Sequence, residues 1–358
     1  MRKPAILPPV MASRARSRSF LAFLAWSGLS AAQAPPSPDP ALEAYARPQR
    51  LVEVERGRRL HLYCLGKGSP TVVLTAGLGQ WSVAWSPVHS QIARIARTCS
   101  WDRAGFGFSD PSDDPQTLKQ TTGDLERLLK RAAGRGPYVL VGHSYGGFES
   151  LLFADRHPRS VAGMVLVDST VPDQSNMQRR AAPAVRRFFD RFEADYLAFL
   201  RRCEADVRNG KLGADATDPD HCFDYPASWP DGLKAAIRRL DSDPRRRATA
   251  RSLIEHSSSG DSDRAAVNPA RHYGRMPLIV LTAGVHRPLP DAPAEILADY
   301  PRIFEAWDRS HDALATLSER GVNRFVAGAG HSIQREKPEA VVAAVREVIE
   351  VARAERRR

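Results

Sequence analysis

The sequence has little cysteine, few aromatic residues and no long hydrophobic run, and each shortage excludes a class of protein. Its four cysteines contain no CxxC pair, and no cluster of histidine, aspartate or glutamate has metal-ligand spacing, so we expect neither a metal nor another cofactor. Only 8% of the residues are aromatic, and they do not interleave with the basic residues as a nucleic-acid platform requires. The N-terminal apolar run is shorter than the roughly 20 residues that a membrane-spanning helix needs.

The N-terminus is typical of an export signal. The basic segment RARSRS precedes the apolar segment FLAFLAWSGLSA, and the small residues of AQA follow it. This order predicts a signal peptide over residues 1–34 that is cleaved after Ala34, with Met1 or Met11 as the start. Its removal takes away five basic residues and no acidic residue, so the formal charge falls from +11 to +6. We therefore expect a secreted or periplasmic protein that has no stable membrane insertion after cleavage.

The cysteines are even in number, which in an exported chain predicts two disulfide bonds with three possible connectivities. These cysteines are Cys64, Cys99, Cys203 and Cys222. The alternative to two disulfides is that all four are buried free thiols.

The rest of the chain alternates short apolar runs with helical patterns. Residues 35–50 begin with PPSPDP and are expected to form a proline-rich linker. Runs such as TVVLTAG, PYVLVGHS and VAGMVLVDS are continuously apolar, which indicates parallel strands buried on both faces and connected by helices. Residues 171–273 are polar, arginine-rich and helical in pattern. The sequence therefore predicts an α/β core over residues 51–170 and 274–358, interrupted by a helical insertion.

One serine stands out because of its neighbours. Gly142-His143-Ser144-Tyr145-Gly146 fits the G-x-S-x-G elbow, in which a serine occupies a strained turn between a strand and a helix. An apolar strand pattern precedes it and a helical pattern follows, which is the context that the motif requires. The alternative, a plain glycine turn, does not explain that context. We therefore predict that Ser144 is a nucleophile.

A serine hydroxyl needs a base, and the base needs an acid that fixes its tautomer. His331 is the expected base, because it follows the last strand pattern, NRFVAGAG, at a glycine-rich turn before the closing helix. His143 adjoins the serine but is expected to serve packing. The chain order for this type of elbow is serine, acid, histidine.

These motifs resemble those of the α/β-hydrolase superfamily, specifically its cap-bearing serine hydrolases. The resemblance extends from Leu51 to Ala352 and is carried by TAGLGQWSVAW, SWDRAGFGFSD, VGHSYGG and GAGHS. It implies a mostly parallel sheet of about eight strands flanked by helices, with residues 171–273 as an inserted helical cap. It also implies that the backbone N–H groups of Leu78 and Tyr145 form an oxyanion hole. The sequence departs from the family in having Ala76 where a histidine is usual.

The acid is less well defined than the serine and the histidine. The family usually places it in a Gly-x-x-Asp turn, but here the first acidic residue after Gly284 is Asp291. Some hydrolases place the acid at the end of the strand that follows the elbow, and that position is Asp168. Asp168 is thus the expected acid and Asp291 the alternative.

The resemblance also suggests roles for several other residues. Asp102 and Arg103 would brace the oxyanion loop, while the aromatic residues Trp81, Trp85 and Phe106 would line the acyl pocket or belong to the core. In this fold the second and fourth strands are neighbours, so Cys64 would pair with Cys99 and leave Cys203 to pair with Cys222 in the cap.

We therefore expect an exported serine hydrolase that cleaves a small or medium carboxylic ester through an acyl-enzyme. A lactonase, an amidase or aminopeptidase, or an acyltransferase would use the same triad. From a different class, an inactive hydrolase-like binding protein would retain the fold alone. The expected partner is a small-molecule substrate, and the sequence leaves its identity and the oligomeric state open.

Overall fold

The computed structural model describes residues 39–134, 136–287 and 292–356, and the predicted signal peptide lies outside them. Eight strands of this described part form one sheet in the order β1-β2-β4-β3-β5-β6-β7-β8. β2 is antiparallel to β1 and β4, whereas neighbours from β4 to β8 are all parallel. The predicted fold class is confirmed. The strands are β1 (Leu51–Glu55), β2 (Arg58–Leu65), β3 (Thr71–Thr75), β4 (Thr98–Trp101), β5 (Tyr138–His143), β6 (Val161–Val167), β7 (Leu278–Ala283) and β8 (Gly321–Val326).

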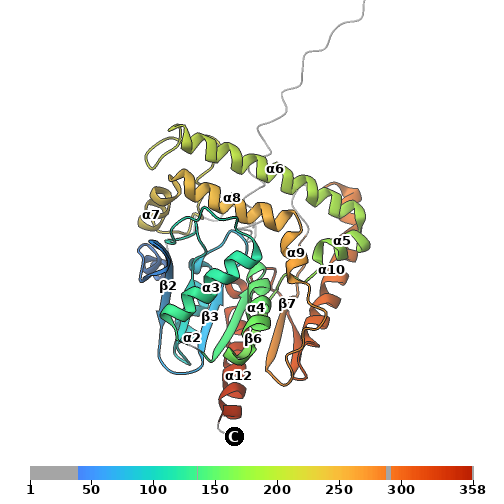
Figure 1. The fold of residues 1–358 in the computed structure, drawn as a ribbon. Helices are drawn as coiled ribbons and strands as arrows, with labels where there is room; N and C mark the ends of the chain where they lie inside the picture. The colour runs from blue at the N-terminus through green and yellow to red at the C-terminus, as the bar shows by residue number, and fades with distance from the viewer. Residues whose placement is uncertain (1–38, 135, 288–291, 357–358) are drawn as a thin grey trace, which may run out of the picture.

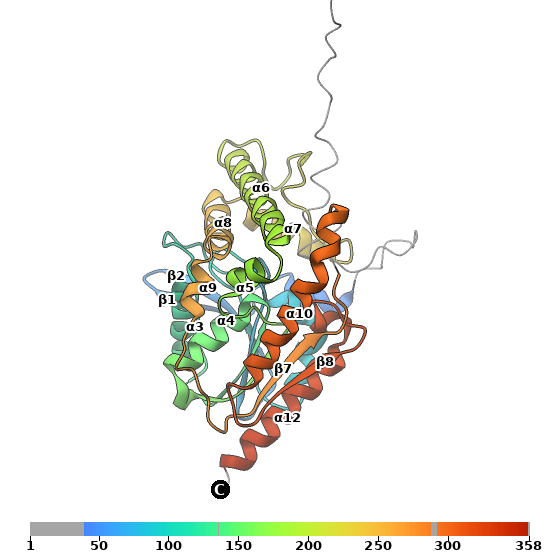
Figure 2. The ribbon, with the colours of Figure 1, turned by 90° about the vertical axis from the view of Figure 1, so that its right-hand side faces the viewer.

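Helices cover both faces of the sheet (Figure 1, Figure 2). Successive side chains of a strand point to opposite faces. Val73 of β3 accordingly packs in one core cluster with α3 and α4, while Leu74 packs in the other with α2 and α12. Leu314 of α10 belongs to the same cluster as Val73. The helices of the two layers are α2 (Ser86–Ala93), α3 (Leu118–Ala132), α4 (Tyr145–Arg156), α10 (Ala294–Ala315) and α12 (Pro338–Arg356).

A group of helices between β6 and β7 in the chain lies over the carboxyl ends of the parallel strands (Figure 1). Buried Arg246 in this group donates hydrogen bonds to the carbonyl oxygens of Gly107 and Ser109, in the loop after β4. The hydroxyl groups of Tyr145 and Ser262 lie 3.0 Å apart and connect α4 to the same group. The predicted helical insertion thus forms a cap that buried polar contacts hold to the core. Its helices are α5 (Gln174–Ala181), α6 (Pro183–Arg208), α7 (Asp231–Asp241), α8 (Pro244–Ser258) and α9 (Asp261–Ala266).

Part of the expected linker is folded. Within residues 35–50, the 3-10 helix η1 (Pro40–Tyr45) places Leu42 and Tyr45 in a buried cluster with Trp81 and with Leu233 of α7. The segment therefore contacts both core and cap and is not only a linker. The remaining short helices are η2 (Ser82–Trp85), η3 (Pro158–Ser160) and α11 (Ile333–Glu336).

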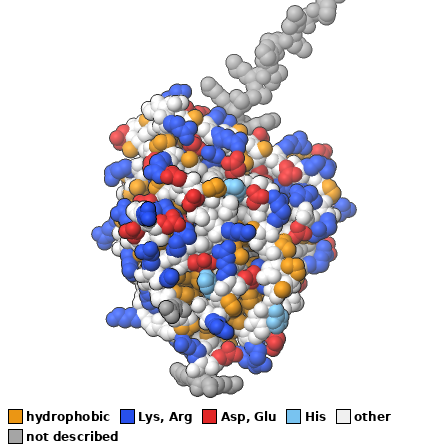
Figure 3. All heavy atoms as spheres, in the orientation of Figure 1, with side chains coloured by type: hydrophobic (Ala, Val, Ile, Leu, Met, Phe, Trp, Pro, Cys, Tyr) orange, Lys and Arg blue, Asp and Glu red, His pale blue; other side chains and the backbone are white. Residues whose placement is uncertain are grey.

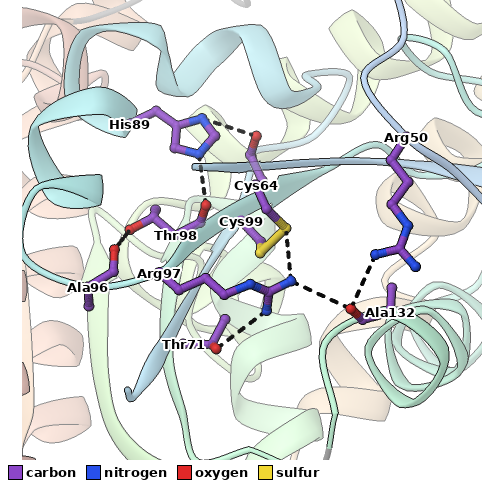
Figure 4. The surroundings of a disulfide bond; sticks show 10 residues. Arg50, Cys64, Thr71, His89, Ala96, Arg97, Thr98, Cys99 and Ala132 are labelled. Atoms are coloured by element: carbon purple, nitrogen blue, oxygen red, sulfur yellow. Dashed lines mark hydrogen bonds between the residues drawn. A yellow bond between two sulfur atoms is a disulfide. The ribbon is translucent and has the colours of Figure 1, made fainter. Parts of the chain in front are cut away.

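Both disulfides implied by the strand arrangement are present. Cys64 of β2 and Cys99 of β4 are direct partners in the antiparallel register and are bonded to each other (Figure 4). The Arg97 guanidinium lies against this disulfide and donates to the carbonyl oxygen of Ala132, at the end of α3. Cys203 of α6 is bonded to Cys222 in the loop before α7, so the second disulfide lies within the cap.

The surface carries charges of both signs. Figure 3 shows the face of the molecule that Figure 1 presents, where basic side chains are widely distributed and interspersed with acidic ones. None of the helices formed by the described residues combines the length and the apolar character that crossing a bilayer requires.

Candidate active site

Ser144 occupies the sharp turn between β5 and α4. Its backbone lies at φ +50° and ψ −123°, a conformation that residues other than glycine rarely adopt without strain. Small neighbours make this turn possible, because a Cβ atom on Gly142 would lie 2.4 Å from the Gly146 carbonyl oxygen. A Cβ atom on Gly146 would lie 2.3 Å from the carbonyl oxygen of Thr75 in β3. The motif is therefore built as the sequence predicts, with a partly exposed serine at the carboxyl end of the sheet.

His331 and Asp168 are brought together from distant parts of the chain. Asp168 follows β6 and is buried, whereas the His331 side chain, in the loop after β8, is 50% exposed. The Nδ1 atom of His331 lies 2.6 Å from Oδ2 of Asp168. A carboxylate only accepts, so Nδ1–H is the donor and Nε2 of the neutral ring is left as a base. The alternative acid, Asp291, lies outside the described residues.

The second oxygen of Asp168 is also occupied. Oδ1 accepts hydrogen bonds from the Ala283 N–H at 3.0 Å and from the Trp307 indole N–H at 3.3 Å. Burial alone would raise the pKa of Asp168, but the hydrogen bond and positive charge of His331 outweigh it, so that this pKa lies well below the usual range. Asp168 is therefore ionised at neutral pH. The sequence does not predict this role of Trp307, because the apolar pattern of α10 does not distinguish a tryptophan that binds the acid from one that only packs in the core.

No hydrogen bond joins Ser144 to His331 in the described part of the chain. The ring centroid of His331 lies 4.8 Å from that of His143, which directly precedes the serine. Catalytic hydrogen bonds are often long or misaligned before substrate binds and tighten in the complex. The arrangement thus places the predicted base against the residue that precedes the predicted nucleophile.

Two backbone N–H groups beside Ser144 are available. Neither the amide of Leu78 nor that of Tyr145 has a hydrogen-bond partner among the described residues. The loop that carries Leu78 is held by Arg103, whose guanidinium donates to the carbonyl oxygens of Ala76 at 2.6 Å and Gly77 at 2.9 Å. Arg103 is itself paired with buried Glu149 of α4. Free amides on a braced loop can stabilise a developing oxyanion.

Asp102 braces a neighbouring segment rather than the oxyanion loop itself. Its carboxylate accepts hydrogen bonds from the N–H of Ser82 at 2.8 Å and of Phe108 at 3.0 Å. Nδ1 of buried His61 lies 2.7 Å from the same carboxylate. These contacts fix the start of η2 and the loop after β4.

The three predicted pocket residues differ in position. Trp85 is fully buried and its ring lies edge-on to that of His143, so it serves as core. Trp81 is buried against Trp229 of the cap, with ring centroids 5.7 Å apart. Phe106 is only partly buried and packs in one cluster with Leu78, so it stays a candidate for the acyl pocket.

No group of three or more histidine, cysteine, aspartate or glutamate side chains that could hold a metal ion occurs among the described residues.

Comparison with protein families and curated proteins identifies relatives of part of the chain. Residues 70–208 match the family model described as alpha/beta hydrolase fold. The protein YqjL of Bacillus subtilis is 37% identical over 108 residues, which are 30% of this chain and 43% of that protein. A cis-3-alkyl-4-alkyloxetan-2-one decarboxylase of Shewanella oneidensis is 31% identical over 116 residues, 32% of this chain and 36% of that protein. The matched stretches thus span less than half the length of these relatives.

Solved structures share the fold across most of the chain. A protein from Pseudomonas aeruginosa assigned as an epoxide hydrolase has a TM-score of 0.57 at 20% identity, covering 85% of this chain and 97% of that one. A serine hydrolase of carbazole degradation, CarC, has a TM-score of 0.51 at 17% identity, covering 84% of this chain and 98% of that one. At these identities the likeness concerns the fold alone.

Proposed function

We propose that this chain, which belongs to the α/β-hydrolase superfamily, is an exported serine hydrolase that cleaves small or medium carboxylic esters through an acyl-enzyme. The observation that carries the proposal is the 2.6 Å contact between His331 and ionised Asp168, beside the strained turn that presents Ser144. A buried carboxylate behind a half-exposed histidine is the arrangement that activates a serine hydroxyl.

The proposed reaction begins when Oγ of Ser144 attacks the ester carbonyl carbon and His331 Nε2 accepts the hydroxyl proton. The N–H groups of Leu78 and Tyr145 stabilise the negative charge on the tetrahedral oxygen. The imidazolium, held by Asp168, then protonates the leaving alcohol and leaves an acyl group on Ser144. In the second half, His331 takes a proton from water, the resulting hydroxide attacks the acyl carbon, and the proton returns to Ser144.

The residue at the elbow supports this reaction over another found on the same fold. Epoxide hydrolases and dehalogenases use an aspartate at the elbow, which forms an ester with the substrate. Here the position is Ser144. We therefore do not propose epoxide hydrolysis for this chain, although one structural neighbour is assigned as an epoxide hydrolase.

The proposed location outside the cytoplasm rests on two features. Two disulfides, Cys64–Cys99 and Cys203–Cys222, suit an oxidising compartment. The N-terminal sequence has the pattern of a signal peptide, and we propose that residues 1–34 are cleaved off after Ala34.

The test is covalent labelling with a fluorophosphonate probe. We expect wild type to label at Ser144 and Ser144→Ala to label not at all, with kcat toward p-nitrophenyl esters reduced by about 10⁴-fold or more. Ser332→Ala, which alters a serine next to His331, is the control and should label like wild type. Failure of wild type to label would favour the inactive binding protein. Aminoacyl anilides, lactones and alcohol acceptors, assayed beside esters of graded chain length, separate ester hydrolysis from the alternatives.

A further inference from the structure

His143 is a buried residue that contacts both the loop of the catalytic base and the oxyanion loop. It is 1% exposed and ends β5, directly before Ser144. Its Nε2 atom lies 2.9 Å from the backbone carbonyl oxygen of His331. Because a carbonyl oxygen can only accept, Nε2 must carry the proton and donate.

The protonation state of His143 is consistent with that bond. Burial, together with the nearby charge of His331, lowers the pKa of His143 to about 3. The ring is therefore neutral at pH 7, and its one proton lies on Nε2. The nearby charge of Asp168 opposes this shift and that of Arg103 adds to it.

The other edge of the ring packs against the oxyanion loop. The side-chain amide of Gln80 lies 3.2 Å from Nδ1 of His143, and because Nδ1 carries no proton in this tautomer it accepts from that amide's N–H. A Cβ atom on Gly77 would lie only 3.0 Å from the same nitrogen, so the loop passes directly against the ring. The residue after Gly77 is Leu78, whose N–H is the proposed oxyanion donor.

The His331 loop has several other hydrogen bonds, two of which lie at or next to His331. The N–H of Gly330 donates to Oε2 of Glu336 at 3.0 Å, and the His331 side chain is bonded to Asp168. Neither contact joins this loop to the strand that presents the nucleophile. The bond from His143 does so, one residue away from Ser144.

We propose that His143 is a positioning residue, whose Nε2–H bond to the His331 carbonyl sets the distance between the base and Ser144. This inference rests on the proposed function and deepens it. A misplacement of about 1 Å between reacting groups can cost about 100-fold in rate. The role assigned is thus directional hydrogen bonding rather than filling of space.

A pair of substitutions separates these two roles. In His143→Gln, the side-chain amide N–H can take the place of Nε2–H, whereas His143→Leu fills the space without a donor. We expect His143→Gln to keep kcat within about threefold of wild type, and His143→Leu to lower kcat by about 10- to 100-fold with little change in KM. Pure packing predicts the reverse order, because a buried amide without a partner is destabilising.

His89 provides the matched control. It is also buried, and its Nε2 lies 3.1 Å from the backbone carbonyl oxygen of Thr98, away from the site. His89→Gln and His89→Leu should both leave kcat within about twofold of wild type, as expected for sites without contact to the reacting groups. If His143→Leu does not fold, His143→Met takes its place.

A second measurement does not depend on turnover. The proton in the short bond between His331 and Asp168 should give a downfield NMR signal that persists in His143→Gln and broadens in His143→Leu. Equal kcat in the two variants, or a higher kcat in the leucine variant, would overturn the positioning role while wild type still reacts at Ser144. A wild type that neither hydrolyses esters nor labels would instead overturn the proposed function, and this role with it.

Discussion

Asp168 has a hydrogen-bond partner on each carboxylate oxygen. Oδ2 accepts from His331, while Oδ1 accepts from the N–H groups of Ala283 and Trp307. Trp307 also packs against buried His311, whose Nε2 lies 2.8 Å from the carbonyl oxygen of Ser169. The carboxylate is therefore fixed from β7 and α10 as well as from its own strand, so its orientation does not depend on His331.

These contacts predict the effect of replacing the acid. Asp168→Asn presents an amide to His331, which favours the tautomer with Nε2 protonated and removes the base. By analogy with the same change in other serine hydrolases, we expect kcat to fall by about 10⁴-fold while the fold is retained. Asp291→Asn is the control and should leave kcat within about threefold of wild type. Steady-state kinetics on a p-nitrophenyl ester checks both, and a large loss in Asp291→Asn alone would reverse the assignment.

The site residues differ in how far sequence could identify them. Ser144 is locally encoded, because the strand, the tight turn and the helix are contiguous and the turn needs glycine on either side. His331 and Asp168 were predicted from their positions at strand ends, which the sheet then brings together. His143 and Trp307 could not be predicted in their present contacts, because those contacts depend on the packing of loops more than 100 positions away.

At the scale of the elements, buried side chains anchor α8 of the cap to the core, among them Thr249, which hydrogen-bonds to Ser112, and Arg246. Arg246 is 4% exposed and donates to the carbonyl oxygens of Gly107 and Ser109. The adjacent Arg245 is exposed and pairs with exposed Asp113. Two neighbouring arginines on one helix thus have opposite environments.

This difference predicts opposite outcomes for one substitution. Arg246→Met leaves two buried carbonyl groups without a donor, so we expect the free energy of unfolding to fall by about 2–4 kcal/mol. Arg245→Met removes a solvent-screened ion pair and should leave stability unchanged within error. Urea unfolding of both variants provides the measurement. Equal stabilities would mean that water replaces the Arg246 hydrogen bonds and that the anchor is dispensable.

The elements also show where pattern recognition ends. Buried strands and amphipathic helices were predicted because their apolar residues repeat along the chain. From the sequence alone, the residues of helix η1 are predicted to lie in a linker. A proline-rich segment precedes this helix, and the helix is too short to show a helical repeat of apolar residues. Its burial arises from partners in α7 and η2, which lie far from it in the sequence.

For the whole molecule, buried histidines connect stability to pH. Burial lowers the pKa of His89 to about 4 and that of His143 to about 3, and it also lowers the pKa of His311. The unfolded chain has ordinary histidines, with a pKa of about 6.5. Between about pH 6.5 and 4, the unfolded state therefore binds protons that the folded state excludes. Stability must then rise with pH in this window and fall as pH is lowered through it.

We accordingly expect the free energy of unfolding to decline below about pH 6.5, with a slope of about 1.4 kcal/mol per pH unit for each such proton. His89→Gln removes one of these protons but keeps a donor for the Thr98 carbonyl, so it should flatten the slope by about one proton. His272→Gln alters an exposed histidine and serves as the control. Urea unfolding at pH 7, 6, 5 and 4.5 measures the slopes, and the same slope in all three proteins would contradict the role of His89.

Because Asp168 has a lowered pKa, its own contribution is lost only at still lower pH. Burial raises the pKa of Glu193 and of Asp263, and their protonation in the folded state opposes the histidine slope. The difference in slope between His89→Gln and wild type therefore reports the histidine.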